Sequence, residues 1–187
     1  AYPEGIDDEL IRVVADNPKI CKYLDIPIQH ANDTVLRRMG RRCTKSEMLE
    51  LFEKIRKEIP DVTLRTSVIA GFPGETDEQA EELCEFIKEI RFDRLGAFSY
   101  SREEGTPGAK MDGQIDEDEK AARTERLMKI QSGISLENNK KKIGKTIEVL
   151  AEGFDESQML YFGRSEADST EIDGNVYFGS EREISEG

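Results

Sequence analysis

Three short apolar stretches alternate with amphipathic helical patterns over the first hundred residues, and this order limits the possible folds more than any other feature. The predicted strands are residues 23–28, 62–70 and 95–100. Two of the intervening helices begin with a capping box, in which Thr44 pairs with Glu47 and Thr76 with Gln79. Strands separated by helices pair in parallel through crossover connections. The pattern therefore predicts an α/β fold with a parallel sheet or part of a barrel.

Further helical patterns flank these strands. Residues 6–17 form a short helix that stops at Pro18, and a turn or two of helix follows Asn32 and ends at Gly40. A long, charge-rich helix begins after Asp116 and continues to about residue 143. We expect residues 1–143 to form one unit.

The sequence changes character after Gly144. Short strand-like runs, separated by Gly, Asp, Glu and Ser, occupy residues 147–153, 159–165 and 175–180. About three strands are too few for a closed barrel. We therefore predict that residues 144–187 form the first part of a small antiparallel β-unit.

Composition narrows the classes of protein that fit. The 187 residues include 40 acidic and 27 basic side chains, a net charge of -13, which disfavours a surface that neutralises many phosphates. No apolar run approaches the roughly 20 residues of a membrane span, and the acidic start lacks a signal core. Three cysteines are an odd number for a disulfide framework, so we expect a reducing cytoplasm and no membrane partner.

The predicted strands are polar on one side, which is unusual for a parallel sheet. Asp25 and Gln29 share one side of the first strand, while Arg65 and Ser67 share one side of the second. Arg65 in mid-strand requires an anionic partner. One interpretation is a ligand site inside an open barrel, with its chemistry at the carboxyl ends of the strands. The alternative is a structural ion pair between Asp25 and Arg65.

Other candidate groups are sparse. The glycine-rich turn at residues 71–75 would allow backbone amides to approach an anion or an adenine ring. His30 is the single histidine, which favours a hydrogen-bonding or packing role. Cys21, Cys43 and Cys84 lack any metal-binding spacing, so we expect no metal site in these residues.

Four segments, taken together and in order, resemble the methylthiotransferases of the radical S-adenosylmethionine (SAM) superfamily. They are YLDIPIQHANDTVLRRMGRRCT, LRTSVIAGFPGETDEQ, FDRLGAFSYSREEGTPGAKM and YFGRSEADSTEIDGNVYF. The resemblance implies the C-terminal half of an open, TIM-like radical SAM barrel, followed by the start of a TRAM domain, a small OB-like barrel. It also implies S-adenosylmethionine and two four-iron four-sulfur clusters as cofactors.

By the same resemblance, Gln29, Arg65, Ser67, Gly71 and Phe72 would line the S-adenosylmethionine cavity. The match to the superfamily's G-x-I-x-G-x-x-E pattern on the fifth barrel strand is partial. Ser67 replaces the first glycine of that pattern, and the acidic residue comes one position late. Only the backbone role of Gly71 therefore carries over readily.

The chain also departs from the family in its cysteines. It lacks the C-x-x-x-C-x-x-C loop that holds the radical cluster, as well as the earlier strands and the N-terminal cluster domain. We therefore expect a C-terminal fragment, whose cluster ligands lie outside this chain and which is catalytically silent alone.

The family acts on two kinds of substrate, and charge distinguishes them. Residues 144–187 contain three basic and eleven acidic side chains, Glu166 and Asp168 among them, for a net charge of -8. An acidic unit repels tRNA and attracts a basic protein. We therefore expect methylthio transfer to the β-carbon of an aspartate in a small-subunit ribosomal protein, with Glu166 and Asp168 contacting it. Modification of a tRNA adenosine is the alternative.

Two further hypotheses remain open at this point. The chain could be a non-catalytic binding module in which the acidic β-unit tethers a partner. It could also be an ordinary barrel enzyme that uses Asp25, His30 and Glu75 for acid–base chemistry without iron. An uncovered edge of the first strand could recruit a second copy of the chain.

Overall fold

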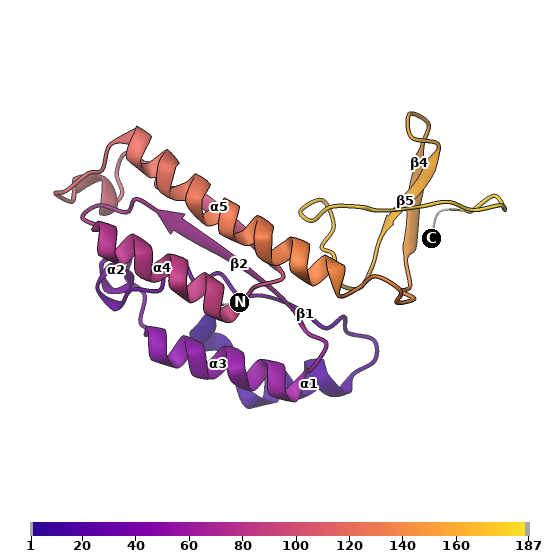
Figure 1. Ribbon diagram of the computed structural model, residues 1–187. Helices are drawn as coiled ribbons and strands as arrows, with labels where there is room; N and C mark the ends of the chain where they lie inside the picture. Colours follow the sequence, from indigo (N-terminus) through magenta and orange to yellow (C-terminus); the bar gives the residue numbers. More distant parts are fainter. Residues whose placement is uncertain (1, 186–187) are drawn as a thin grey trace.

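The computed structural model describes residues 2–185, and Figure 1 shows the order of their elements. The helices are α1 (Asp8–Asp16), α2 (Asp33–Arg38), α3 (Lys45–Glu58), α4 (Asp77–Ile90) and α5 (Glu117–Lys140), with 3-10 turns η1 (Pro3–Gly5) and η2 (Gly108–Lys110). The strands are β1 (Tyr23–Asp25), β2 (Thr63–Ala70), β3 (Arg94–Ser99), β4 (Leu150–Asp155), β5 (Leu160–Arg164) and β6 (Val176–Phe178). The predicted α/β class is confirmed. None of the described helices is long and apolar enough to cross a membrane.

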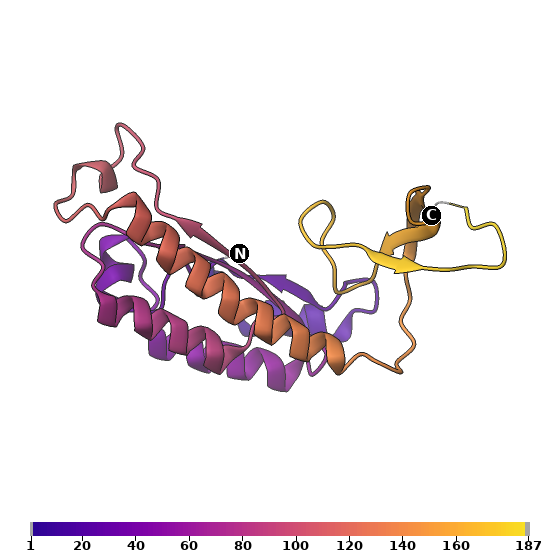
Figure 2. The same cartoon turned by 45° about the horizontal axis from the view of Figure 1, so that its top comes forward.

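Strands β1, β2 and β3 form one parallel sheet in chain order. Asp25 pairs with Arg65, and Arg65 pairs with Arg94, so one row of residues crosses all three strands. The arrows of this sheet that are visible in Figure 2 point the same way. The segments that follow the strands therefore meet at one edge of the sheet, where sites of parallel α/β folds form.

Strand β1 is shorter than the predicted 23–28. Pro27 has no N–H to donate, and the Ile28 amide donates to the side-chain oxygen of Thr66 (3.3 Å) instead of to a backbone carbonyl. Gln29 then adopts a left-handed φ of 69° and forms an isolated parallel bridge with Val68. The interruption places Gln29 beside the end of β2.

The hydrophobic core lies between this sheet and helices α1, α3, α4 and α5. Alternate residues of β2 face the helices and are buried, whereas Arg65, Ser67 and Ile69 between them are only half-buried. The core includes Leu64, Val68, Ile11, Val14, Phe52, Ile55, Phe86, Ile87, Leu127 and Ile134. The predicted polar side of the sheet is therefore its side opposite the core.

The predicted starts of α2, α3, α4 and α5 are confirmed, whereas α1 begins at Asp8, two residues later than predicted. Both capping boxes form, with Thr44 and Glu47 at the start of α3 and Thr76 and Gln79 at the start of α4. Asp116 accepts a hydrogen bond from the amide of residue 118 at the start of α5, which ends at Lys140, slightly earlier than expected.

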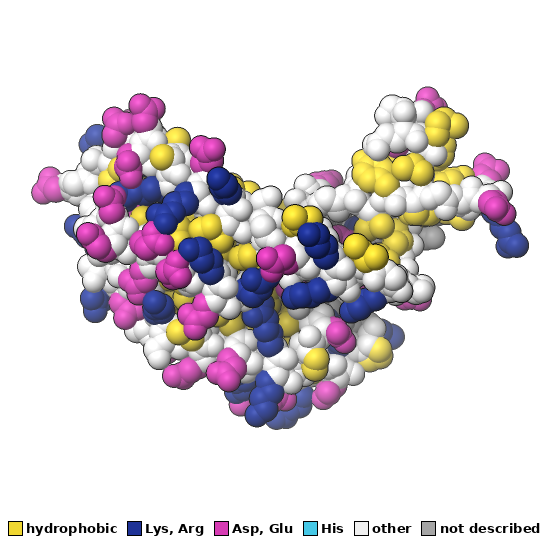
Figure 3. All heavy atoms as spheres, viewed as in Figure 1, with side chains coloured by type: hydrophobic (Ala, Val, Ile, Leu, Met, Phe, Trp, Pro, Cys, Tyr) yellow, Lys and Arg dark blue, Asp and Glu magenta, His cyan; other side chains and the backbone are white. Residues whose placement is uncertain are grey.

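Strands β4, β5 and β6 form a second, antiparallel sheet, as the sequence predicts. Phe154, Tyr161 and Phe178 form a row of contacting rings along it, with centroids 5.0 Å and 5.8 Å apart. Other apolar side chains of this part, such as Met159 and Tyr177, are exposed. Figure 3 shows apolar side chains gathered over this part of the molecule.

Truncation of a side chain should cost much more stability on the core side of the first sheet than on its polar side. Phe52 is fully buried and meets Phe92 edge-on at 5.0 Å, so Phe52→Ala should lower the free energy of unfolding by about 3–5 kcal/mol. Phe98 on β3 is 56% exposed, so Phe98→Ala should cost less than about 1 kcal/mol. Urea denaturation measures both. Equal losses would show that the polar side is also part of the core.

Candidate cofactor and substrate site

A cavity of about 420 Å³ lies at the edge where the parallel strands end. Five of its lining residues come from the ends of the three strands and the segments that follow: Gln29, Ile69, Phe72, Tyr100 and Ser101. The end of α2 contributes Arg38 and Arg41, and the loop between β3 and α5 closes another side. This volume lies in the range of roughly 300–1,000 Å³ that small-molecule sites occupy.

An aromatic corner forms one wall of the cavity. The rings of Phe72 and Tyr100 meet edge-on at 5.2 Å, and the ammonium of Lys120 lies 5.3 Å from the Tyr100 ring centre. Gly108 passes so close to Tyr100 that a Cβ there would lie 2.6 Å from the hydroxyl. This hydroxyl is buried and has no hydrogen-bond partner within residues 2–185. Tyr100 therefore lines the cavity while its hydroxyl is a buried polar group that these residues leave unsatisfied.

The polar side of the sheet continues from this cavity toward the start of the strands. Arg65 donates to the Asp25 carboxylate at 2.8 Å, so the predicted structural ion pair is present. The backbone amide of Gln29 donates to the backbone carbonyl of Ser67 at 3.0 Å. Arg65 and Ser67 lie on the same side of β2, and Gln29 lines the cavity together with Ile69 of that side.

The glycine-rich turn after β2 is bound by a side chain of its own chain. The amides of Gly71 and Phe72 both donate to one carboxylate oxygen of Glu75, at 2.9 Å and 3.3 Å. Because Glu75 occupies these two amides, they are not available to an anion or an adenine ring, contrary to the role considered for the turn. The chain thus supplies its own anion here.

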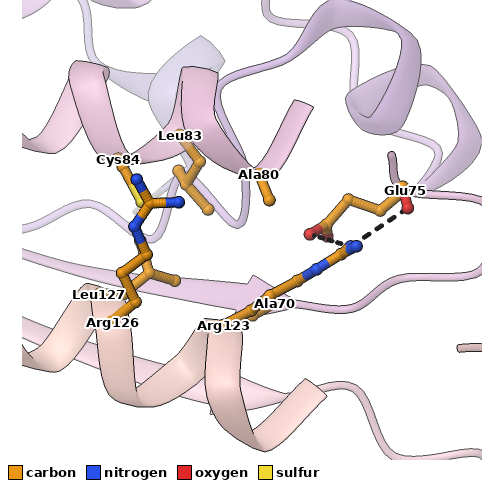
Figure 4. A pocket seen from close by; sticks show the side chains of 8 residues that line it. All are labelled: Ala70, Glu75, Ala80, Leu83, Cys84, Arg123, Arg126 and Leu127. Carbon is orange, nitrogen blue, oxygen red and sulfur yellow. Dashed lines mark hydrogen bonds and ion pairs between the residues drawn. The ribbon is translucent and has the colours of Figure 1, made fainter. Parts of the chain in front are cut away.

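Glu75 is the centre of a buried polar cluster. Arg123 of α5 donates to the Glu75 carboxylate at 2.9 Å and to its carbonyl at 3.1 Å, and Figure 4 shows the two side chains pointing toward each other. The cavity drawn there has a volume of about 20 Å³, room for about one water molecule. It is therefore a packing gap, too small for a nucleotide.

Burial by itself raises the pKa of the Glu75 carboxyl, but His30 and Arg123 outweigh this effect and hold the pKa below its ordinary value. His30 is fully buried, and its Nε2 lies 3.6 Å from Glu75 Oε2. The backbone amide of Asn32 donates to His30 Nδ1 at 2.9 Å. Because Nδ1 accepts this bond, the ring proton lies on Nε2. This histidine links the start of α2 to the turn. Its burial leaves no access for a substrate.

Gly71 makes room for another residue of α5. A Cβ at Gly71 would lie 2.4 Å from Lys120 Cγ, and Gly71 has a left-handed φ of 75°. Lys120 is 1% exposed and donates to Glu117 at 2.6 Å. The α5 helix therefore packs directly onto the turn through Lys120 and Arg123.

The cysteines do not form a metal site. Cys21 is exposed, Cys84 is buried in the core, and burial raises the pKa of the half-buried Cys43 thiol to about 11. Within residues 2–185 no group of three or more His, Cys, Asp or Glu side chains could hold a metal ion.

The two acidic residues named for substrate contact differ in their surroundings. Glu166 is exposed. Asp168 is 8% exposed and accepts from Arg94 of β3 at 2.6 Å, so its carboxylate is engaged within the chain. Of the two, only Glu166 presents a carboxylate to solvent.

The five residues named for the cofactor cavity are distributed over one continuous region. Gln29 and Phe72 line the cavity, Arg65 and Ser67 lie farther along the same face, and Gly71 lies in the turn itself, against Lys120. The roles of these residues in binding remain predictions.

The sequence places Tyr100 at the carboxyl end of the third predicted strand, but sequence reasoning missed Lys120 and Arg123 as neighbours of the site. A lysine and an arginine three residues apart on one helix face were the available signal for the last two.

Comparison with known families agrees with this architecture. Residues 2–87 match the radical SAM superfamily, and residues 143–187 match the TRAM domain. The solved coproporphyrinogen III oxidase HemN of Escherichia coli, a radical SAM enzyme, superposes on 72% of this chain and 31% of its own, with a TM-score of 0.59 and 17% identity. That similarity supports the fold alone. The chain therefore matches a radical SAM domain over residues 2–87 and a TRAM domain over residues 143–187.

Closer relatives bear one name. The chain is 50% identical, over 186 residues, to the ribosomal protein uS12 methylthiotransferase RimO of Lachnoclostridium phytofermentans. It is 51% identical over 178 residues to the protein of the same name from Pelobacter propionicus. The matches cover 100% and 95% of this chain, but 42% and 40% of those relatives. The chain therefore spans less than half of their length.

Because Glu75 is the centre of a buried polar cluster, removing its negative charge should make the folded chain less stable. The carboxylate of Glu75 accepts hydrogen bonds from two backbone amides and forms an ion pair with Arg123. Glu75→Gln removes its negative charge and should lower the free energy of unfolding at pH 7 by about 2–3 kcal/mol. Because the folded pKa is lowered, this stabilisation is present above the unfolded value of 4.5 and disappears as the pH falls through the folded value. Urea denaturation at pH 7 and pH 3 should therefore show that the free energy of unfolding changes less between the two pH values for the variant than for the wild type.

The matched control for that comparison is Glu81→Gln, which breaks the exposed pair with Arg126. This variant should change the free energy of unfolding by less than about 1 kcal/mol. The same pH dependence for Glu75→Gln and wild type would contradict the assigned role of Glu75.

The close approach of α5 to the turn predicts a different response at two glycines. Gly71→Ala should cost about 1–3 kcal/mol more than Gly40→Ala, because both have a positive φ but only Gly71 lacks space for a Cβ. Adding Lys120→Ala should recover part of the Gly71→Ala loss. Thermal denaturation measures these variants, and equal costs at the two glycines would contradict the packing argument.

Proposed function

We propose that this chain is part of a radical SAM enzyme that transfers a methylthio group to the β-carbon of an aspartate in ribosomal protein uS12. The observation that carries this proposal is the 50% identity to uS12 methylthiotransferases across both the barrel region and the TRAM domain. A shared fold alone would not distinguish among radical SAM enzymes.

The cavity at the strand ends suits S-adenosylmethionine. It combines an aromatic corner for an adenine ring, the side chain of Gln29, and the unpartnered Tyr100 hydroxyl. S-adenosylmethionine would supply the methyl group and the reactive species for attack on an unactivated carbon. Gln29, Phe72 and Tyr100 would orient it, while the loop between β3 and α5 would limit the access of water. Arg65 and Ser67 would extend the polar wall below.

The cysteines present do not fit an iron–sulfur cluster. They lack the required spacing, and the structure shows one exposed, one half-buried and one in the core. The two four-iron four-sulfur clusters of the proposed enzyme would therefore be held by residues outside this chain. These 187 residues by themselves would then be inactive.

The charge of the TRAM region supports a basic protein as substrate rather than tRNA. The exposed acidic residues of this region include Glu148, Glu156, Glu166 and Glu171. Negative carboxylates attract a basic protein and repel a phosphate backbone. Figure 3 shows side chains of both charge signs over the barrel region in that view.

The proposal has three further parts. Residues 1–143 and 144–187 would act as separate units, and the enzyme would work in the cytoplasm. Strand β1 lies at an edge of the sheet, where a second copy could pair.

A chimera tests the function directly. Residues 1–187 would replace the matching region of the L. phytofermentans RimO, to which they align over their full length. After anaerobic reconstitution with iron and sulfide, the chimera should add a methylthio group to an aspartate of uS12, detected by peptide mass spectrometry. Modification of a tRNA adenosine instead, or of neither substrate, would contradict the proposal.

A variant of the chimera tests the cavity. Gln29→Ala should weaken S-adenosylmethionine binding by about tenfold, through the loss of hydrogen bonds in the cavity. Gln158→Ala, in the exposed turn between β4 and β5, is the matched control and should bind as the parent does. Isothermal titration calorimetry measures both. Equal affinities for the two variants would remove Gln29 from the site.

A further inference from the structure

Two aspartates of the TRAM region are buried against the barrel region. The side chains of Asp168 and Asp173 are each 5% exposed, although both lie in the loop that connects β5 to β6. A carboxylate that loses water needs a compensating partner. Both aspartates find theirs on the first sheet, more than seventy residues away in sequence.

Arg94 and Tyr23 are the receiving groups. Arg94 Nη2 donates to Asp168 at 2.6 Å, and Arg94 Nε lies 3.7 Å from Asp173. The Tyr23 hydroxyl donates to the second oxygen of Asp173 at 2.7 Å. Burial and this bond raise the pKa of Tyr23, so it remains a donor. Arg94 and Tyr23 are the first residues of β3 and β1, at the sheet edge opposite the cavity.

The loop is shaped to present these two carboxylates. Ser165 donates to Asp168 through its amide (3.0 Å) and its hydroxyl (2.6 Å), and the Ser169 amide donates to Asp173 at 2.8 Å. Asp168 thus has one oxygen held by its own loop and one turned toward Arg94, whereas Asp173 uses the same oxygen, Oδ2, for the loop amide and for Tyr23. In Figures 1 and 2 the loop, drawn in yellow, reaches back beside the start of β1.

We propose that loop 165–173 is a plug that closes the lower end of the polar face of the first sheet, with Arg94 and Tyr23 as its docking site. The row that contains Arg94 also contains Arg65 and Asp25, so the plug ends where the polar face begins. Molecules then cannot enter this face past its lower end. The docking also holds the β4–β6 sheet in a defined position on the barrel region, whatever substrate the enzyme modifies.

The plug separates the acidic residues of the TRAM region into two groups. Asp168 and Asp173 serve the docking, and Glu152 pairs with Arg164 inside the second sheet at 2.6 Å. The exposed glutamates remain for an external partner. Undocking would expose two further carboxylates and free the second sheet.

Amide hydrogen exchange of the 187-residue chain tests the plug. Arg94→Gln should speed exchange in residues 165–173 by about tenfold or more, because it removes hydrogen bonds to charged groups. Exchange in β2 and α4 should stay within twofold of wild type. Arg94→Lys should give an intermediate rate, since it keeps the charge but loses the second donor.

Arg126→Gln is the matched control, because it removes an arginine from the exposed pair with Glu81. It should leave loop exchange unchanged. Tyr23→Phe removes a single hydroxyl and should speed exchange around Asp173 by a few-fold, which keeps the test valid if Arg94→Gln unfolds the chain. Loop exchange within twofold of wild type in both Tyr23→Phe and Arg94→Gln, or in Tyr23→Phe alone if Arg94→Gln unfolds, would overturn the proposal.

Discussion

The buried carboxylate of Glu75 is the interaction on which the site region depends. It accepts hydrogen bonds from the backbone amides of Gly71 and Phe72, contacts His30 and forms an ion pair with Arg123. These groups come from the segments after two strands and from α5. Leaving any of them buried without a partner costs free energy, so the cluster fixes the turn that forms the cavity wall.

The molecule uses negative charge in two ways. Inside the barrel region, Asp25 and Glu75 neutralise arginines on one sheet face and under one turn. In the TRAM region, Asp168 and Asp173 dock on Arg94, while other carboxylates remain in solvent. A count of acidic residues therefore overstates the charge that a partner meets. The exposed remainder is still acidic.

Local signals in the sequence predicted the elements well. Capping boxes at Thr44 and Thr76 and apolar spacing placed the helices, because these signals act within a few residues. The end of β1 was predicted too late, because Pro27 and the left-handed Gln29 interrupt its pairing. The gathering of polar residues on one sheet face followed from the two-residue period of a strand, which is also local.

The sequence by itself determined the order of helices and strands, the polar side of the sheet and the resemblance to radical SAM methylthiotransferases. Only the tertiary structure decided that Glu75 occupies the amides of the turn, that Lys120 fills the space beside Gly71, and that Asp168 faces Arg94. Each of these contacts joins backbone or side-chain groups whose relative position depends on how elements pack. Charge and residue type predict that such a group needs a partner, but three-dimensional packing selects which one.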